Sequence, residues 1–553
     1  MYDSSIERSN SLQRMSLRRR DTRRNTCGST CGRVHFRGGA VVILTLLALT
    51  LSTAAERILV VPRWQPHDFE FTAHVSTQNP FLVPFNAVVI GPGGISFKVP
   101  GFFDGNGMWK IRVAPSTEGL WKLQTESELP ELTGKTVTFE CGPNPNAKVH
   151  GVLRVDKDHA HHFIFDDGTR FYMQGYEYDW LWALDMDKTD VPTVSKTLDL
   201  IGSYGFNYVI LNSFAYDTKW RAGKTGPDDF GPPLLLLWEG DNDHPVHSRM
   251  NLAYWHHYDQ VIAALSERGI QAHMLIKVYN KQVQWPAHNS PEEQLLFRWL
   301  VARYSAYPNI IWDFSKEAHK ETDLAYKQGW LKYLRETDPN HHLITVHDDD
   351  AANDSGAYDG LTDFRADQQH RRYHETILRQ RARRNWPVAN VESDYECGPG
   401  GVTDKTYGSA HTTDQTLRTL WEIAMAGGYT AYYYTYTAWD VIHPLDVPAG
   451  YGQMKHFGDF WRSTQYWLLQ PSDSLVSDGW CLANAGKEYV VYQNLATPFK
   501  LDIRNAAAKL SAEWFNPFIG LKTAAGSQEG GTAEFNPPAD WGSAPIILHL
   551  KAK

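Results

Sequence analysis

Cysteine is scarce in this chain: there are five among 553 residues, and only Cys141, Cys397 and Cys481 lie beyond residue 55. Three thiols are too few for a disulfide framework, so packed cores must hold the fold, although one bridge remains open. Long apolar runs are also scarce. The run from Ala40 to Leu51 is about half as long as a membrane-spanning helix requires.

Several local motifs are missing as well. The chain has no G-x-S-x-G elbow, no complete P-loop and no H-E-x-x-H pair, which leaves hydrolases of the serine-elbow type, nucleotide-binding proteins and zinc proteases without local support. We predict no metal site and no cofactor. The segment Asp158–His162 is expected to be a surface strand with alternating histidines, and Asp348–Asp350 a solvated loop, with a calcium-stabilised loop as the alternative.

The first 55 residues have the pattern of an export signal. Seven arginines between positions 18 and 37 precede the apolar run, and Ser52-Thr53-Ala54-Ala55 follows it. We therefore expect a signal peptide over 1–55, cleaved near Ala55, and a secreted or periplasmic protein. An uncleaved anchor and a translation start at Met15 are the alternatives.

The charge balance narrows the class of partner. Removal of 1–55 takes away nine arginines and three acidic residues, so the net charge moves from −9 to about −15. We expect neither a nucleic-acid partner nor stable membrane insertion after leader cleavage. Aromatic residues make up 13% of the chain, and their flat faces suit sugar rings as well as protein cores. The sequence does not predict the oligomeric state.

Short strand-like runs separated by turn signals occupy both ends of the mature chain. Residues 56–146 are predicted to form an N-terminal Ig-like β-sandwich, with a linker at Gly142–Asn146. Residues 467–553 are predicted to form a C-terminal β-sandwich. The N-terminal prediction also follows from the absence of helical periodicity there, and the C-terminal one from the return of short strand-like runs after about Trp467.

The middle of the chain, 150–466, alternates helix, glycine and strand. An Asp167-Gly168 hairpin leads into a first strand, and the pattern then repeats until eight strands are counted, which predicts an α/β fold: a (β/α)8 barrel flanked by the N-terminal β-sandwich and the C-terminal β-domain. The seven later strands are expected at Phe206–Leu211, Ile270–Val278, Asn309–Phe314, Leu343–Val346, Leu361–Phe364, Pro387–Val391 and Tyr429–Tyr436.

Glutamates follow two of these strands. Glu317 comes after the fourth strand and Glu392 after the seventh, where functional residues of such barrels lie. A pair of carboxyl groups from different strands is what glycoside hydrolysis requires, so both are predicted to be catalytic. Asp313 competes with Glu317, and Glu396 with Glu392, for these roles.

Other strand ends carry residue types that bind sugars. Polar groups fix hydroxyls and flat rings stack on sugar faces, although the tryptophans are as readily packing residues. The predicted substrate-binding residues are Asp179, Trp180, Asn212, Lys316, His347, Gln369, His370, Tyr395, Glu396 and Trp439. Lys277 is another strand residue, which we expect either to contact substrate or to pair with a barrel carboxylate.

Several motifs together carry a family resemblance. They include Pro100-Gly101-Phe102-Phe103, Tyr176–Trp182, Trp312–Glu317, Glu392–Glu396 and Trp514-Phe515-Asn516-Pro517. On these motifs the chain resembles clan-A-type glycoside hydrolases of the apiosidase-like group, which have an N-terminal β-sandwich of unknown function and a C-terminal domain labelled as collagen-binding. The resemblance implies that Glu317 is the acid/base and Glu392 the nucleophile.

One position departs from the group. An asparagine usually precedes the acid/base, whereas this chain has Lys316 before Glu317. A cation there is expected to lower the pKa of a close carboxyl group, against the needs of a general acid, or to bind an anionic substituent such as a uronate or sulfate.

The sequence therefore predicts a secreted glycoside hydrolase that cleaves O-glycosidic bonds in a polysaccharide or oligosaccharide with retention, with carboxyl groups about 5–5.5 Å apart. A non-catalytic carbohydrate-binding cell-surface protein on a degenerate barrel is the alternative, kept open by Lys316. A polysaccharide lyase is the third possibility.

Overall fold

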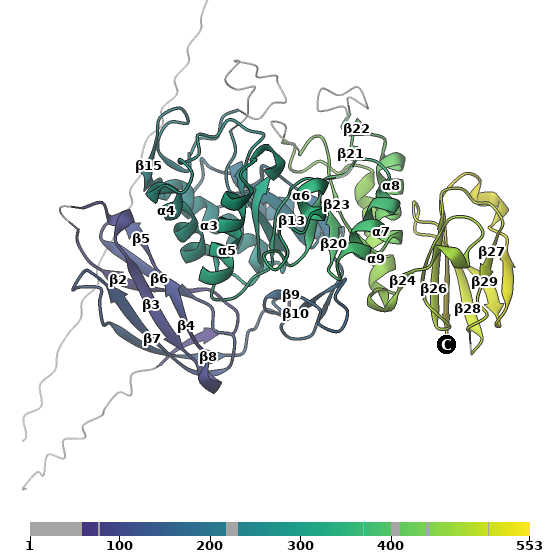
Figure 1. Cartoon of the computed structure of the whole chain (residues 1–553), viewed down its shortest axis with the longest axis horizontal. Helices are drawn as coiled ribbons and strands as arrows, with labels where there is room; N and C mark the ends of the chain where they lie inside the picture. The colour runs from purple at the N-terminus through teal and green to yellow at the C-terminus, as the bar shows by residue number, and fades with distance from the viewer. Residues whose placement is uncertain are drawn as a thin grey trace, which may run out of the picture. The chain divides into compact units, whose positions relative to one another are not determined.

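The computed structural model describes residues 58–75, 78–216, 231–368, 370–399, 410–437, 442–506 and 508–552 (Figure 1). Residues 58–553 form one compact unit by their internal contacts, and the predicted leader lies outside the described residues. Among the residues that the structure describes, no helix has both the length and the apolar character needed to cross a bilayer.

An eight-stranded parallel sheet occupies the middle of the chain and confirms the predicted barrel. Its two outer strands, β18 and β19, are joined by a parallel bridge between His347 and Ala366, which closes the ring. In chain order the strands are β12 (Gln174–Glu177), β13 (Tyr208–Asn212), β16 (Gln271–Val278), β17 (Ile310–Lys316), β18 (Ile344–Thr345), β19 (Arg365–Asp367), β20 (Val388–Asn390) and β23 (Tyr429–Tyr432).

Helices connect the strands as the glycine-stopped pattern predicts. Gly205 and Gly269 lie just beyond the first two of them with φ of 88° and 69°, values that suit glycine at a helix C-terminus. The described helices are α1 (Pro192–Ser203), α3 (Leu252–Glu267), α4 (Pro291–Tyr304), α5 (Leu324–Thr337), α6 (Asp350–Asp354), α7 (Tyr373–Arg383), α8 (Thr413–Met425) and α9 (Gly450–Arg462).

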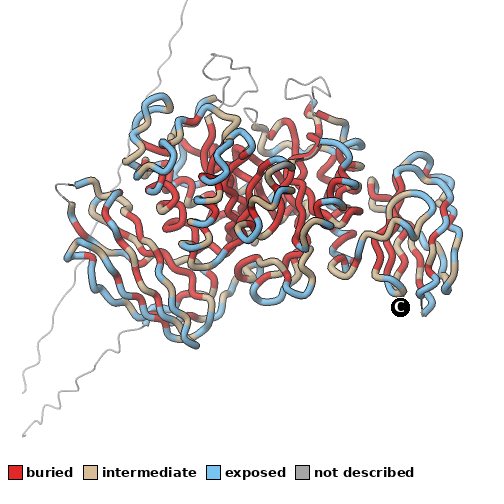
Figure 2. Tube along the Cα trace, viewed as in Figure 1, coloured by how far each residue is buried: buried red, intermediate tan, exposed pale blue. Residues whose placement is uncertain are grey.

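The barrel strands are buried along their whole length (Figure 2). All eight residues of β16 and all seven of β17 are buried, as expected for parallel strands covered by helices. Lys277 of β16 points toward α4, where its ammonium pairs with Glu293 and donates to the Tyr326 hydroxyl at 2.6 Å. Lys277 is therefore a structural partner of α4, one of the two roles expected for it.

Glu293 also shapes the start of α4, because it takes part in the contacts at this helix N-terminus. The Ser290 hydroxyl accepts from the Glu293 amide at 3.2 Å, which is half of a capping box. The Glu293 carboxylate instead accepts from the Asn289 amide at 2.6 Å and pairs with Lys277, so the reciprocal bond to Ser290 is replaced.

Strands before and after the barrel form separate β-structures with their own cores. The first has a five-stranded sheet, β1-β8-β7-β3-β4, and a three-stranded sheet, β2-β6-β5. Their bounds are β1 (Leu59–Pro62), β2 (His67–Thr72), β3 (Phe85–Ile90), β4 (Ser96–Pro100), β5 (Phe102–Gly105), β6 (Met108–Val113), β7 (Gly119–Ser127) and β8 (Thr136–Gly142).

The last β-structure has a six-stranded sheet, β24-β25-β26-β31-β28-β29, and a pair, β27-β30. Its strands are β24 (Gln470–Pro471), β25 (Trp480–Asn484), β26 (Glu488–Gln493), β27 (Phe499–Asp502), β28 (Leu510–Phe515), β29 (Lys522–Gln528), β30 (Thr532–Phe535) and β31 (Ile546–Ala552). Four short ladders or hairpins remain: β9 (Leu153–Val155) with β10 (Phe163–Phe165), β10 with β11 (Arg170–Phe171), β14 (Trp238–Gly240) with β15 (Pro245–Met250), and β21 (Tyr395–Glu396) with β22 (Ala410–His411).

Two local expectations need correction. The sixth barrel strand begins at Arg365, not Leu361, because Leu361 and Thr362 close a turn on the Tyr358 carbonyl. The segment 158–162 forms turns instead of a surface strand, and His162 is buried with a ring nitrogen 2.8 Å from the Tyr429 hydroxyl. No disulfide joins Cys141, Cys397 or Cys481 in the part of the chain that the structure describes.

Candidate active site

The predicted site residues gather at the C-terminal ends of the barrel strands. Asp179 follows β12, Asn212 ends β13, Lys316 ends β17, and Glu392 follows β20. Because all eight strands are parallel, these ends lie at one face of the barrel. Gln369 and Trp439 lie outside the described residues, so the structure does not place them.

Lys316 is the centre of a buried ionic cluster. Its ammonium lies 3.1 Å from an Asp179 oxygen and 3.2 Å from a Glu392 oxygen, and it also donates to Glu177. All four side chains are at most 1% exposed. Burial opposes the charged form of Lys316, yet the charges of Asp179, Glu177 and Glu392 raise its pKa well above the usual value.

This arrangement changes the role expected for the lysine. Lys316 was predicted to influence the neighbouring Glu317 or to bind an anionic substituent. Its ammonium instead faces three carboxyl groups, from the end of β12, the segment just after β12 and the segment after β20, and it is fully buried. The geometry thus favours an internal role for this cation over one as an anion receptor.

Glu392 is held from two sides. One oxygen accepts from the Tyr395 hydroxyl, and the other forms the 3.2 Å ion pair with Lys316, whose geometry is not that of a hydrogen bond. Burial raises the pKa of Tyr395 well above its usual value, so its hydroxyl keeps its proton. The Tyr395 ring lies 4.3 Å from the ring of Tyr433, whose hydroxyl donates to Asp179.

Glu317 has a different environment. Its backbone is left-handed, with φ of 50° and ψ of 48°, a conformation that non-glycine residues adopt mainly where surrounding structure enforces it. One carboxylate oxygen accepts from the Asn280 amide at 2.7 Å, and the other pairs with Lys320 at 2.5 Å. The side chain is 13% exposed, more than that of Glu392.

Two polar residues of the site have unused hydrogen-bonding capacity among the described residues. His347 is 2% exposed and neither ring nitrogen has a hydrogen-bond partner there, while burial lowers its pKa to about 4. The imidazole is therefore neutral and offers one donor and one acceptor. The side-chain oxygen of Asn212 is likewise buried without a partner in the described chain.

The aromatic candidates are placed differently from one another. Trp180 is fully buried and its ring lies 5.6 Å from that of Trp182, a packing arrangement. His370 is exposed, and its ring centre is 6.2 Å from that of Tyr395. Of Trp180 and His370, only His370 is therefore open to solvent.

The two competing carboxyl groups have structural partners. Glu396 is buried and accepts from the Tyr432 hydroxyl at 2.7 Å, the Thr413 hydroxyl at 2.8 Å and the Gly450 amide at 3.2 Å. These contacts tie β21 to β23, α8 and α9, away from Lys316. Asp313 is fully buried within β17, where it lies 2.8 Å from a ring nitrogen of His273.

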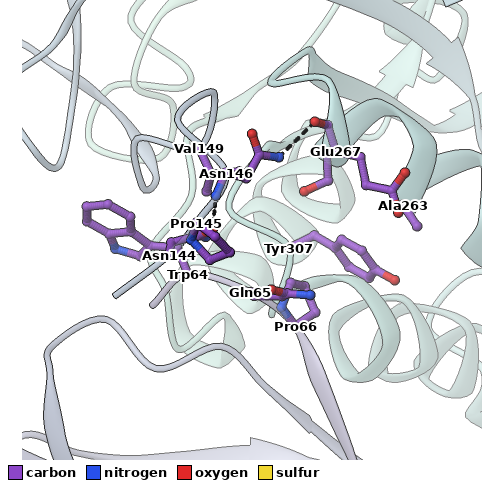
Figure 3. A pocket seen from close by; sticks show the side chains of 11 residues that line it. Trp64, Gln65, Pro66, Asn144, Pro145, Asn146, Val149, Ala263, Glu267 and Tyr307 are labelled. Atoms are coloured by element: carbon purple, nitrogen blue, oxygen red, sulfur yellow. Dashed lines mark hydrogen bonds between the residues drawn. The ribbon is translucent and has the colours of Figure 1, made fainter. Parts of the chain in front are cut away.

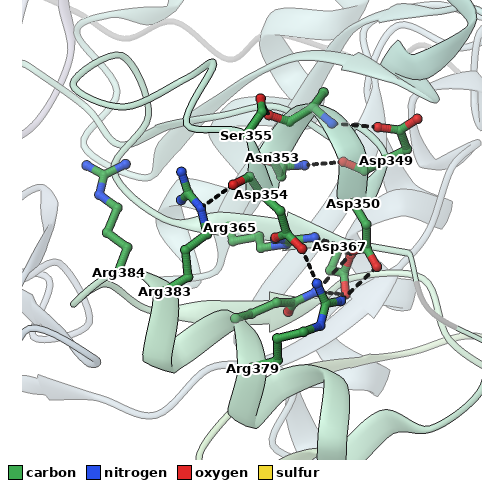
Figure 4. A network of polar contacts seen from close by, with 12 residues as sticks. Asp349, Asp350, Asn353, Asp354, Ser355, Arg365, Asp367, Arg379, Arg383 and Arg384 are labelled. Atoms are coloured by element: carbon green, nitrogen blue, oxygen red, sulfur yellow. Dashed lines mark hydrogen bonds and ion pairs between the residues drawn. The ribbon is translucent and has the colours of Figure 1, made fainter.

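The acidic stretch after β18 is neutralised by arginines (Figure 4). Arg365 pairs with Asp350 and Asp354, and Arg379 pairs with the same two residues. Asp348 pairs with Lys327 at 2.6 Å. No group of three or more potential metal ligands occurs among the residues that the structure describes.

A separate cavity of about 210 Å³ is lined by Trp64, Asn146, Glu267 and Tyr307 among others (Figure 3). Tyr307 precedes β17 and Glu267 ends α3, so this cavity belongs to the N-terminal ends of the strands. The Trp64 ring is 7% exposed and the Arg63 guanidinium lies 3.7 Å from its centre. The Trp64 ring therefore has no open face on which a sugar could stack.

Sequence reasoning missed four residues of the site. Glu177 and Tyr433 complete the Lys316 cluster, and Asn280 and Lys320 hold Glu317. Glu177 lies within a motif that had been noted, two residues before Asp179. Lys320 lies three residues after Glu317, a spacing at which charges meet on a helical turn.

The parallel (β/α)8 barrel carries carboxyl groups at its C-terminal strand ends, and the family match over this region shows that the protein is a glycoside hydrolase. Residues 157–467, more than half of the chain, match the family described as "Apiosidase-like, catalytic domain", and the chain belongs to this family. Residues 60–128 match a domain of unknown function, DUF5060.

Solved structures share the fold. A protein from Bacteroides vulgatus ATCC 8482, described as a candidate glycoside hydrolase, is 18% identical with a TM-score of 0.72, over 89% of this chain and 99% of that one. A family 5 glycoside hydrolase from the same organism is 18% identical with a TM-score of 0.57, over 73% of this chain and 93% of that one. No curated protein matches the chain.

Proposed function

We propose that this enzyme hydrolyses O-glycosidic bonds of a polysaccharide or oligosaccharide with retention, Glu392 acting as nucleophile and Glu317 as acid/base. The observation that carries the proposal is the contrast between the two carboxyl groups. Glu392 is buried and fixed by Lys316 and Tyr395, whereas Glu317 is partly exposed at the end of β17. A nucleophile needs a fixed orientation, and an acid/base must exchange protons with water.

The chemistry takes two steps. In the first, Glu317 gives its proton to the leaving oxygen while a Glu392 oxygen attacks the anomeric carbon, which forms a glycosyl-enzyme ester. In the second, Glu317 removes a proton from water, which attacks the same carbon and releases Glu392. Retention requires the two carboxyl groups to lie about 5–5.5 Å apart when substrate is bound.

Neighbouring groups suit a sugar ring rich in hydroxyls. The neutral His347 imidazole supplies one donor and one acceptor, and Asn212 supplies a buried amide oxygen. Buried polar groups without partners are costly unless a ligand completes their hydrogen bonds. We therefore assign both to substrate binding, where each would meet a hydroxyl.

The test compares three variants with the same chemical change. Glu392→Gln and Glu317→Gln should each lower turnover by at least about 10³-fold on whichever substrate a broad glycan panel reveals, with product masses as the readout. Glu396→Gln is the matched control, since this buried glutamate lies four residues from Glu392 but bonds Tyr432, Thr413 and Gly450. Azide should restore turnover in a Glu392→Gly variant.

The stereochemistry decides the mechanism. Proton NMR of the first product should show the anomeric configuration of the substrate. An inverted product, or full activity of Glu392→Gln, would refute the covalent step. Ligand binding without turnover by the wild type would support a carbohydrate-binding protein instead, and an unsaturated product absorbing in the ultraviolet would indicate a lyase.

We also propose that the enzyme is exported by its N-terminal segment. The arginines before the Ala40–Leu51 run and the small residues up to Ala55 support this. Expression of the full chain in a secretion-competent host, followed by N-terminal sequencing, should give a mature protein that starts near Glu56. Retention of Met1 or Met15 in the active protein would refute cleavage.

A further inference from the structure

The cluster around Lys316 contains more acidic groups than its cation can balance. Glu177, Asp179 and Glu392 all pair with the one ammonium, and every side chain is at most 1% exposed. With all three ionised, the cluster would hold two excess negative charges away from water. Such a state is costly, and carboxyl groups in this situation take up a proton instead.

The hydrogen bonds show which of the three is least stabilised as an anion. Both oxygens of Asp179 accept a hydrogen bond from Lys316, at 3.1 and 3.2 Å, and one of them also accepts from the Tyr433 hydroxyl. Glu392 receives the Tyr395 hydroxyl in addition to the ion pair. Only one oxygen of Glu177 accepts a hydrogen bond from Lys316. The other, Oε2, is buried without a hydrogen-bond partner in the described chain.

We propose that Glu177 is a positioning residue that holds the cluster's proton on Oε2 at neutral pH, so that the charge of Lys316 is shared by Asp179 and Glu392. The inference rests on the proposed role of Glu392 as nucleophile. A neutral Glu177 still accepts from Lys316 and so fixes the ammonium, but it does not compete as an anion. The negative charge of Glu392 is thereby compensated by Lys316 in the enzyme without substrate.

The surrounding groups agree with this assignment. The groups that face Glu177 are Lys316 from β17, Asp179 from the segment just after β12, Glu392 after β20, and the phenols Tyr395 and Tyr433. Burial is the largest cause that raises the pKa of Glu177 well above the usual value, the charge of Glu392 adds to it, and Lys316 opposes it.

Two isosteric variants separate this proposal from a plain salt bridge. Glutamine mimics a protonated carboxyl group, so Glu177→Gln should leave the acidic limb of the pH profile of kcat/KM in place. Asp179→Asn removes a real charge, which leaves more of the Lys316 charge for Glu392 and should move that limb down by about one pH unit. If both variants shift the limb alike, Glu177 is ionised and the proposal is wrong.

A second measurement needs no substrate. In wild-type protein with ¹³C-labelled glutamate carboxyls, one resonance at pH 7 should have the chemical shift of a protonated acid and disappear in Glu177→Gln. Burial also raises the pKa values of Glu396 and Glu422, so their glutamine variants assign their own signals. If Glu177→Gln does not fold, a protonated signal that is still present in both of those variants is assigned to Glu177 by elimination.

The two readouts fail separately. The proposal about Glu177 is overturned if Glu177→Gln keeps every protonated signal of the wild type. It is also overturned if the wild type has no protonated signal beyond those of Glu396 and Glu422. Absence of turnover on every glycan overturns the proposed function and leaves the NMR result to decide the protonation state alone.

Discussion

Replacement of Lys316 by methionine tests the ionic cluster most directly. Methionine keeps much of the side-chain volume but removes the ammonium that faces Glu177, Asp179 and Glu392. Removing one partner from a buried ion pair leaves uncompensated charge and typically costs about 3–5 kcal/mol of folding free energy. Domains are stable by about 5–15 kcal/mol, so the variant should fold but open more readily.

A matched control uses a second lysine next to the same strand. Lys320 pairs with Glu317, but its side chain is 45% exposed. A solvated pair contributes about 0–1 kcal/mol, so Lys320→Met should change stability by no more than that. Hydrogen exchange of peptides from β17 reports on the barrel itself, which matters in a chain with several β-structures.

The pH dependence gives a second check on the same variant. In the wild type, the folded pKa of Lys316 lies well above its ordinary 10.5, so its contribution is complete below that value and is lost only as pH rises through the folded pKa. Without the cation, the buried cluster would hold uncompensated negative charge, so the folded variant should bind protons more readily than the unfolded chain. The stability deficit of Lys316→Met should therefore shrink from pH 7 toward about pH 5. Equal costs in both lysine variants, or a deficit that grows in acid, would refute the cluster.

Four further outcomes are expected. Tyr395→Phe removes the hydroxyl donor to Glu392 and should lower kcat/KM by about 10–150-fold, since a hydrogen bond to a charged group contributes about 1.5–3 kcal/mol; initial rates measure it. Glu396→Gln should lose about 1–3 kcal/mol in urea unfolding yet keep kcat/KM, because it places an amide among three donors. The folded pKa of Glu177 lies above its unfolded value, so its contribution is complete below about pH 4.5 and is lost as pH rises; unfolding titrations should show the wild type losing about 1.4 kcal/mol per pH unit relative to Glu177→Gln between roughly pH 5 and 7. His347→Ala should raise KM more than it lowers kcat in steady-state kinetics, because it removes a binding group.

The positions of the two glutamates were predictable from sequence, because helix stops and strand runs follow short-range rules. Gly205 and Gly269 mark helix ends, and the buried runs after them give the strand count that puts Glu317 after β17 and Glu392 after β20. The sixth strand was misplaced by four residues. Its three-residue length gives too short a pattern to fix a boundary.

The direction of side chains at the strand ends was not predictable. Within a strand, side chains alternate between faces, but Glu317 leaves the strand with a left-handed backbone. Lys316 and Glu317 are consecutive, yet one ammonium reaches β12 and the other side chain reaches Asn280. Two partners of Lys316, Asp179 just after β12 and Glu177 at its end, lie 137 and 139 residues away along the chain, and no local rule links them to the lysine.

The lysine that departs from the family pattern is best understood together with the acids it contacts. An asparagine before the acid/base is neutral and needs no counter-charge, whereas a buried lysine does. The chain supplies that charge through Glu177 at the end of β12, through Asp179 just after it, and through Glu392. Because the acids, Glu392 included, outnumber the lysine, the protonation state of Glu177 decides how much of the Lys316 charge is left to compensate Glu392. Lys316 is therefore one member of an ionic unit that spans β12, β17 and the segment after β20, and its effect on catalysis depends on all of its partners.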